Sequence, residues 1–249
     1  MTTTSVETIP SITRAEAEVL AATEYVRLVE QLRSLGSDDW ARPTDCPLWD
    51  VRAMAGHSVG MLSDFTSLRS VMRRMRAATK EAKKVGGPVI DSMTAMQVAD
   101  YAALSPTELI AHAAEAGPRA ARWRATAPGL FRRMPMKETV GGRPETWRIG
   151  YLLDTILTRD PWMHRVDIAR ATGRDLVLTP DHDGRIVADV VAEWARRHGQ
   201  PFSLTLTGPA GGHFTTGAGE HITIDAVEFC RTLSGRSPGS GLLTQEVPF

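Results

Sequence analysis

The sequence is poor in cysteine and has no long apolar run. Its 249 residues include only two cysteines, Cys46 and Cys230, which lie far apart and outside any CxxC spacing. This excludes a disulfide framework and a cysteine-rich zinc site, so a bound metal would need histidine and carboxylate ligands. No apolar run approaches the roughly 20 residues that a membrane-spanning helix requires. We therefore expect a protein without a membrane partner.

The sequence also has no excess of positive or negative charge, because its 29 Lys and Arg residues balance its 29 Asp and Glu residues. This balance argues against nucleic acid as the main partner. The N-terminus lacks a basic start followed by an apolar block, so we expect no signal peptide and a cytoplasmic location. The sequence also has no GxGxxG, Walker loop or GxSxG motif, which leaves nucleotide binding and serine hydrolysis without support.

The spacing of apolar residues predicts four long amphipathic helices in the first 173 residues. They are expected over residues 12–35, 50–84, 105–126 and 145–171. Ser105 and Glu108 form a capping-box pattern at the start of the third helix, and Gly173 offers a left-handed cap after the fourth. Four such segments are typical of a helical bundle.

After Gly173 the pattern changes. Residues 179–200 predict a helix, and period-two alternation over 202–208 predicts a strand. Two further short strands are expected at 211–217 and 221–225 in an antiparallel arrangement, followed by a helix that Asp225 caps and Gly235 stops. The sequence thus predicts a mainly α protein, with a four-helix bundle over residues 10–173 and a small α/β domain over residues 174–249.

Three polar side chains fall on the inward faces of two of these helices. Asp160 and His164 share the apolar stripe of the fourth helix, and His57 lies between apolar residues of the second. Buried polar groups need partners, and two histidines with a carboxylate have the composition of a metal site with open positions. Alternatively, His57 is an ordinary core histidine, and Asp160 with His164 is a surface i,i+4 pair worth about 0.2–0.5 kcal/mol.

Pro161 follows Asp160 directly and lacks the amide that would bond to Leu157. It is expected to kink or locally unwind the helix, which can reshape the wall of a pocket. The alternative is that Pro161 starts a new helical segment capped by Asp160, in which case the carboxylate would face the helix end and not a metal.

The segments "DCPLWDVRAMAGHSVG" and "LLDTILTRDPWMHRVDIARATGR" resemble two signature regions of the mycothiol-dependent maleylpyruvate isomerase family. The resemblance implies a DinB-like four-helix bundle followed by a small α/β domain. It also implies that His57, Asp160 and His164 bind a divalent metal. The family pattern commonly has CPGW where this sequence has CPLW, and often Glu where it has Asp160. Asp154 is the alternative carboxylate.

The resemblance further implies mycothiol as a small-molecule thiol partner, with its sulfur beside the metal. A divalent ion stabilises a thiolate, and the softness of sulfur favours zinc. Addition of the thiolate to a small electrophilic substrate would lead to cis–trans isomerisation or to S-transfer. The metal site by itself is compatible with both reactions. The alternative is a non-catalytic protein of the same fold that binds a metal or ligand for a regulatory or structural purpose.

Other charged residues are weaker candidates. Arg52 and Arg159 flank the metal-ligand candidates, and either could bind a substrate carboxylate as a catalytic residue or pair with Asp50 and Asp154. A basic run is expected to be a solvated helix face, with anion binding as the alternative. That run comprises Arg69, Arg73, Arg74, Arg76, Lys80, Lys83 and Lys84. His213 and His221 are expected at the surface, and the chain is expected to be a monomer or a homodimer.

Overall fold

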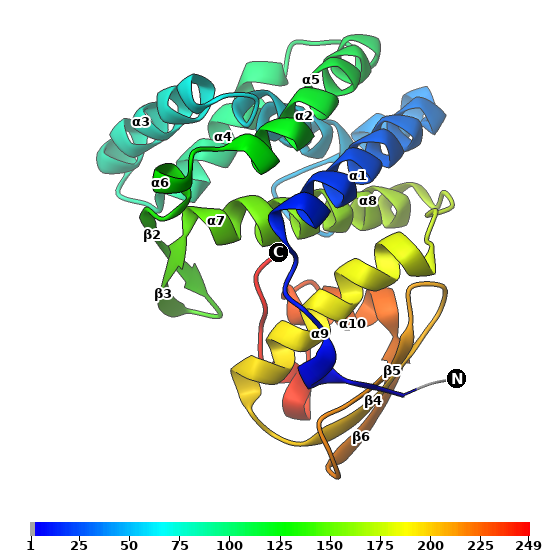
Figure 1. Ribbon diagram of the computed structural model, residues 1–249. Coiled ribbons are helices and arrows are strands. Elements are labelled where there is room, and N and C mark those ends of the chain that lie inside the picture. The colour runs from blue at the N-terminus through cyan, green and yellow to red at the C-terminus, as the bar shows by residue number, and fades with distance from the viewer. Residues whose placement is uncertain (1–2) are drawn as a thin grey trace. The chain divides into compact units, whose positions relative to one another are not determined.

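The computed structural model describes residues 3–249, which are mainly helical with a small mixed sheet formed largely by the C-terminal part of the chain (Figure 1). They divide into two compact units. The helical unit comprises Arg14–Glu138 and Trp147–Asp175, and the sheet unit comprises the chain up to Thr13, Thr139–Thr146 and Leu176–Phe249. No helix among the described residues is both long and apolar enough to span a bilayer.

The helical unit begins with one long helix and continues through a series of helices joined by short turns (Figure 1). Its elements are α1 (Arg14–Ser34), η2 (Ser37–Ala41), α2 (Val51–Asp64), α3 (Leu68–Val85), α4 (Val89–Tyr101), α5 (Pro106–Thr126), α6 (Gly129–Arg132), α7 (Ile149–Tyr151), η3 (Leu152–Ile156) and α8 (Leu157–Thr172).

Helices α1, α2, α5 and α8 enclose the core of this unit. Helix α1 packs against α5 and α8, and α2 packs against α5 and α8, so the four share one apolar interior. Leu28, Met54, Leu109 and Leu153 are completely buried there. The predicted capping box starts α5, because Glu108 N–H donates to Ser105 Oγ (3.3 Å) and Ser105 N–H donates to Glu108 Oε2 (2.7 Å).

The predicted second helix is two helices. Helix α2 ends at Asp64, and α3 starts after Ser67, whose hydroxyl accepts from Ser70 N–H (3.2 Å). A serine in this position satisfies an otherwise unpaired amide at a helix start, so the chain can turn without losing hydrogen bonds. Helix α4, which packs against α2 and α3, has no counterpart among the predicted elements.

The predicted fourth helix also starts too early. Strands β2 (Pro135–Val140) and β3 (Arg143–Arg148) form a hairpin that occupies the first part of the predicted range. Gly141 and Gly142 both have positive φ (54° and 74°), which is the backbone of a type I′ turn. The helix itself begins at Ile149 and ends before Gly173, whose left-handed conformation (φ 68°) was predicted.

The sheet unit contains a four-stranded sheet in the order β1-β5-β4-β6. Its elements are β1 (Thr3–Ser5), η1 (Val6–Thr8), η4 (Pro180–Gly184), α9 (Arg185–His198), β4 (Phe202–Thr207), β5 (Gly212–Thr215), β6 (Glu220–Asp225), α10 (Ala226–Leu233) and η5 (Gly241–Thr244). Trp194 of α9 packs against Phe202 and Phe229, with ring centroids 4.7 and 5.3 Å apart, and anchors the core of this unit.

The sheet is mixed, so the expectation of antiparallel strands is wrong in part. Strand β4 pairs antiparallel with β5, but β6 pairs parallel with β4, with Leu204 opposite Ile222. The N-terminal strand β1 pairs parallel with β5 and was not predicted. Pairing partners distant in sequence decide these directions, whereas period-two alternation reports only which face of a strand is buried.

Candidate metal centre

His57, Asp160 and His164 converge in the helical unit, where α2 and α8 pack together. Asp160 lies between the two histidines. Its Oδ1 is 3.2 Å from His164 Nε2, and its Oδ2 is 3.7 Å from His57 Nε2. The imidazole rings of His57 and His164 stand nearly perpendicular, with centroids 5.0 Å apart. Three ligands at about 2.0–2.2 Å from one ion have separations of this size, so the donor set fits a single divalent cation.

Unpaired atoms mark the same place. His57 Nδ1, Asp160 Oδ2 and His164 Nε2 are buried and have no hydrogen-bond partner among the described residues. The side chains of both histidines are 6% exposed and that of Asp160 is 22% exposed, which leaves the carboxylate an opening to the outside. Buried polar atoms without partners are costly, and an ion coordinated beside Asp160 would remove that cost for Asp160 Oδ2 and His164 Nε2, whereas His57 faces Asp160 through its other ring nitrogen, Nε2.

The electrostatics also suit a cation. Burial by itself would raise the pKa of Asp160, but the adjacent imidazoles of His164 and His57 outweigh it and hold the pKa well below its usual range. Burial likewise would lower the pKa of His164, yet the carboxylates of Asp160 and Asp167 raise it to about 9. The cluster therefore keeps an ionised carboxylate at neutral pH, and its negative charges hold on His164 a proton that a bound cation would displace.

Asp167 and Cys46 lie behind His164 and were not among the predicted site residues. Asp167 Oδ2 is 3.3 Å from His164 Nδ1 and 3.9 Å from Cys46 Sγ. The Asp167 side chain is fully buried. The signal was present in the sequence, because residues three apart on a helix share a face and Asp167 follows His164 by three.

A short turn holds Trp49 against the cluster. Trp49 N–H donates to Cys46 O (2.9 Å), closing a turn with Pro47 at its second position, where proline is favoured. The Trp49 ring lies 4.8 Å from the His57 ring and 5.9 Å from the His164 ring. Asp50 then caps α2 by accepting from Ala53 N–H (2.7 Å). The indole thus covers one side of both histidines.

The backbone before Asp160 is irregular and Arg124 supports it. Residues Leu152–Ile156 form a π-helical turn, and α8 then runs through Pro161. Because Pro161 has no N–H, Leu157 O lacks its helical donor, and Arg124 Nη1 supplies one at 2.9 Å. Arg124 also donates to Leu153 O (2.6 Å). The helix stays continuous through Pro161, and its irregular turn lies one turn earlier, at Leu152–Ile156, so the kink or unwinding expected at Pro161 itself is not seen. The alternative of a new helix that starts at Pro161 and is capped by Asp160 is wrong, because both residues lie inside α8.

The remaining arginine candidates lie in different settings. Arg52 Nη2 donates to the carbonyls of Ala102 (3.0 Å) and Leu104, so Arg52 contacts the turn after α4 and does not pair with Asp50. Arg159 is fully buried on α8. Since neighbouring helical residues point about 100° apart, its side chain leaves the helix on a different face from Asp160.

Asp154 is engaged elsewhere. It lies in the π-helical turn and forms an ion pair with Arg132. The group of potential ligands around His57 contains Asp160, not Asp154. Of the two carboxylates considered from the sequence, the structure therefore brings only Asp160 to the histidines.

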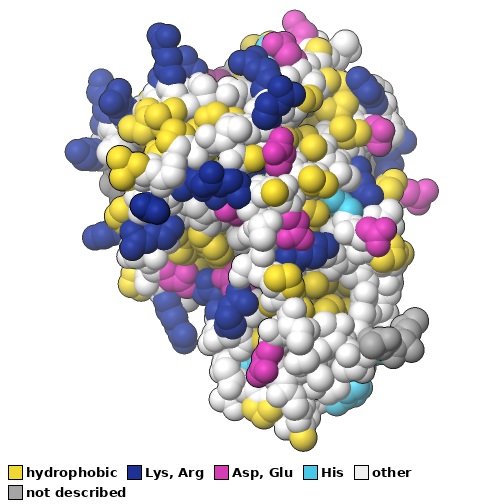
Figure 2. Space-filling model, in the orientation of Figure 1, with side chains coloured by type: hydrophobic (Ala, Val, Ile, Leu, Met, Phe, Trp, Pro, Cys, Tyr) yellow, Lys and Arg dark blue, Asp and Glu magenta, His cyan; other side chains and the backbone are white. Residues whose placement is uncertain are grey.

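The predicted basic run lies on α3. Figure 2 shows dark blue side chains over this helix, at the upper left of the view. Most members of the run are exposed. Arg74 differs, because it forms ion pairs with Asp64 (2.7 Å) and Asp100 (2.6 Å). In the sheet unit, His221 is exposed as expected, whereas His213 is half-buried and 3.2 Å from Thr205 Oγ1.

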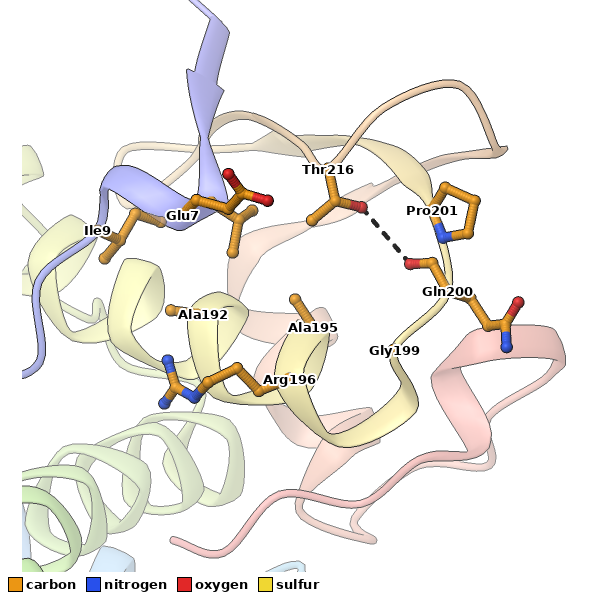
Figure 3. Close-up of a pocket in the computed structure, with 10 residues that line it drawn as sticks. Glu7, Ile9, Ala192, Ala195, Arg196, Gly199, Gln200, Pro201 and Thr216 are labelled. Atoms are coloured by element: carbon orange, nitrogen blue, oxygen red, sulfur yellow. Dashed lines mark hydrogen bonds between the residues drawn. The ribbon is translucent and has the colours of Figure 1, made fainter.

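A hollow of about 530 Å³ lies in the sheet unit between η1, α9 and the loop after α9 (Figure 3). Glu7 and Arg196 carry its charges, and Thr216 Oγ1 donates to Gln200 O (3.5 Å) on one side. Its lining contains no histidine, cysteine or aspartate. It therefore offers no set of metal ligands and no histidine to activate the Thr216 hydroxyl, and the cluster on α2 and α8 is the better candidate for chemistry.

Comparison with known proteins agrees with the resemblance seen in the sequence. Two solved structures superpose on 95% of this chain and 93% of their own, at 16% identity. They are the mycothiol-dependent maleylpyruvate isomerase (TM-score 0.54) and a histidine-to-alanine variant of it (TM-score 0.53), and they establish similarity of fold. No curated protein sequence matches the chain significantly. The family model for the mycothiol maleylpyruvate isomerase N-terminal domain matches residues 21–169, and the chain belongs to this family.

Proposed function

We propose that the protein is a mycothiol-dependent metalloenzyme of the maleylpyruvate isomerase type, which acts on a small electrophilic substrate by cis–trans isomerisation or S-transfer. The observation that carries the proposal is the convergence of His57, Asp160 and His164, each with a buried atom that lacks a partner. Family membership supports mycothiol as the thiol partner. Zinc is the proposed ion, because two imidazoles and a carboxylate with open positions are typical of catalytic zinc.

A divalent cation held here would stabilise a thiolate at neutral pH and so supply the nucleophile. Asp160 would contribute the single negative charge of the ligand set, and His57 and His164 would contribute neutral nitrogens. The Trp49 ring would exclude water from one side of both imidazoles. The contacts of Arg52 support a role in joining α2 to the turn after α4. Binding of a substrate carboxylate by Arg159 stays a prediction from the sequence, which its complete burial on another face of α8 does not support.

The type of helical bundle and the limits of the domains belong to the same proposal. We propose that the helices form a DinB-like bundle and that the domains are residues 10–173 and 174–249. The sheet unit contains additional pieces of chain, up to Thr13 and over Thr139–Thr146, so limited proteolysis would test those limits. The cytoplasmic location and the monomeric or homodimeric state remain predictions, which cell fractionation and light scattering would check.

The test is turnover with mycothiol and maleylpyruvate by the zinc-loaded protein, with loss of the substrate absorbance reporting isomerisation and mass spectrometry reporting any thiol conjugate. We expect turnover that requires both zinc and mycothiol, and that falls at least a hundredfold in His164→Ala. His112→Ala is the matched control, because His112 is an exposed histidine on α5. Its turnover should equal that of the parent protein.

Each outcome has a distinct meaning. A mycothiol conjugate without an isomer would assign the protein to S-transfer. Zinc binding without turnover of maleylpyruvate or of a panel of small electrophiles would contradict the proposed enzymatic activity. It would favour the alternative of a non-catalytic metal-binding protein. Equal turnover in His164→Ala and in the parent would reject this cluster as the active site.

A further inference from the structure

Asp167 occupies the position behind His164 that a supporting carboxylate takes in a metal centre. Its Oδ2 faces His164 Nδ1 at 3.3 Å, while His164 Nε2 faces Asp160 at 3.2 Å on the opposite edge of the ring. The Asp167 side chain is fully buried and that of His164 is 6% exposed. The imidazole is therefore held between two carboxylates, one on each ring nitrogen.

The two carboxylates differ in what surrounds them. Asp160 is 22% exposed and adjoins His57, the second imidazole of the cluster. Asp167 instead adjoins Cys46, whose Sγ lies 3.9 Å from the same Oδ2 that faces His164. A carboxylate that accepts a hydrogen bond from one ring nitrogen of a histidine fixes the proton there and leaves the other nitrogen free to bind metal.

We propose that Asp167 is a positioning residue for the metal centre: it accepts the His164 Nδ1–H hydrogen bond and so directs His164 Nε2 toward the ion shared with Asp160 and His57. The proposal rests on the proposed function, because it takes the metal to lie on the Asp160 side of His164. Cys46 contacts the same carboxylate and thereby links the turn that carries Trp49 to the ligand helix, without itself binding the ion.

A competing arrangement is available on the other side of the ring. Cys46, His164 and Asp167 also have potential ligand atoms within 4.8 Å of one another. A cation there would use His164 Nδ1 and the Cys46 sulfur, and Asp167 would then be a ligand itself. The two arrangements make opposite predictions for the metallated ring nitrogen and for the importance of Cys46.

The experiment measures zinc affinity by competition with a chromophoric chelator in Asp167→Asn, Cys46→Ala and His57→Ala, each checked for folding by circular dichroism. We expect zinc affinity to fall about 10- to 100-fold in Asp167→Asn, the usual effect of losing an outer carboxylate. Asp167→Glu, which keeps the acceptor, should recover part of that loss. Cys46→Ala should stay within threefold of the parent protein.

Nitrogen-15 NMR of the zinc-loaded parent protein provides a readout that does not depend on the folding of any variant. We expect zinc on Nε2 of His164 and a proton on Nδ1, with that proton shifted downfield by its bond to Asp167. Zinc on Nδ1, a thiolate-to-metal absorption band with cobalt that Cys46→Ala abolishes, or an unchanged zinc affinity in a folded Asp167→Asn would each overturn the proposal. An unchanged affinity in His57→Ala would instead overturn the metal site on which it rests.

Discussion

Replacing Arg124 with methionine should destabilise the helical unit more than any surface change on the same helix. The Arg124 side chain is completely buried and supplies donors to the irregular start of α8. It donates to Leu153 O (2.6 Å), Leu157 O (2.9 Å) and Tyr25 Oη (3.0 Å), and it also contacts Thr158 Oγ1. Methionine keeps most of the aliphatic volume and removes every one of these donors.

Two opposing effects determine the magnitude. Removing a buried guanidinium relieves the cost of keeping its charge out of water, which favours the variant. Against this, each buried acceptor that loses its partner costs about 1–3 kcal/mol, and Leu157 O cannot obtain another donor from the helix because Pro161 has no N–H. With three carbonyls affected, those of Leu153, Asp154 and Leu157, together with two hydroxyls, we expect a net loss of about 3 kcal/mol in the free energy of unfolding.

The assay is thermal and urea unfolding followed by circular dichroism. A loss of about 3 kcal/mol corresponds to a fall in Tm of roughly 6–12 °C for a chain of this size. Arg122→Met is the matched control, since Arg122 is exposed on the same helix and its replacement should stay within about 0.5 kcal/mol of the parent. Equal stability of the two variants would refute the idea that Arg124 supports the irregular backbone before Asp160.

Two further substitutions test packing and pH dependence. Gly60→Ala should cost about 1–3 kcal/mol in urea unfolding, because its Cβ would lie 2.6 Å from Gln97 Cβ, whereas Gly129→Ala, with nothing within 4 Å, should be neutral; equal costs would contradict this packing argument. The Gly36 N–H donates to Asp39 (2.8 Å) and holds the pKa of Asp39 below its usual value. The ionised Asp39 side chain therefore stabilises the folded protein fully above a pH of about 4, and this contribution is lost as the pH falls through the lower pKa of the folded state. Asp39→Asn should therefore be less stable than the parent protein in unfolding curves at pH 6 but equal to it in strong acid, and a difference that persists in strong acid would contradict the assignment.

Local signals in the sequence predicted the features that depend on neighbouring residues. The Ser105 capping box and the left-handed cap at Gly173 follow from side chains within a few positions, and both are present. The apolar stripe likewise placed Asp160 and His164 on one face, and the structure brings both to His57. Such features can be predicted from the sequence because the backbone hydrogen bonds that they satisfy join residues close together in the chain.

Three features were not predicted, although only one of them involves contacts between residues distant in sequence. The hairpin around Gly141 and Gly142 interrupts a range that reads as helical, although paired glycines between alternating segments are a hairpin signal. The π-helical turn before Asp160 accepts hydrogen bonds from Arg124, a residue about thirty positions earlier, and the spacing of apolar residues does not reveal such a contact. Asp167 was not predicted, because the apolar stripe identifies residues that face the cluster, whereas Asp167 contacts His164 from behind, at Nδ1.

The most direct test of the metal centre is the zinc affinity and stoichiometry of the parent protein, Asp160→Asn and Asp154→Asn, measured by chelator competition and elemental analysis. We predict one zinc per chain in the parent protein, a loss of affinity of at least a hundredfold in Asp160→Asn, and a change of less than threefold in Asp154→Asn, whose carboxylate pairs with Arg132. Zinc binding by Asp160→Asn that matches the parent protein would contradict the assignment of His57, Asp160 and His164 as the metal ligands.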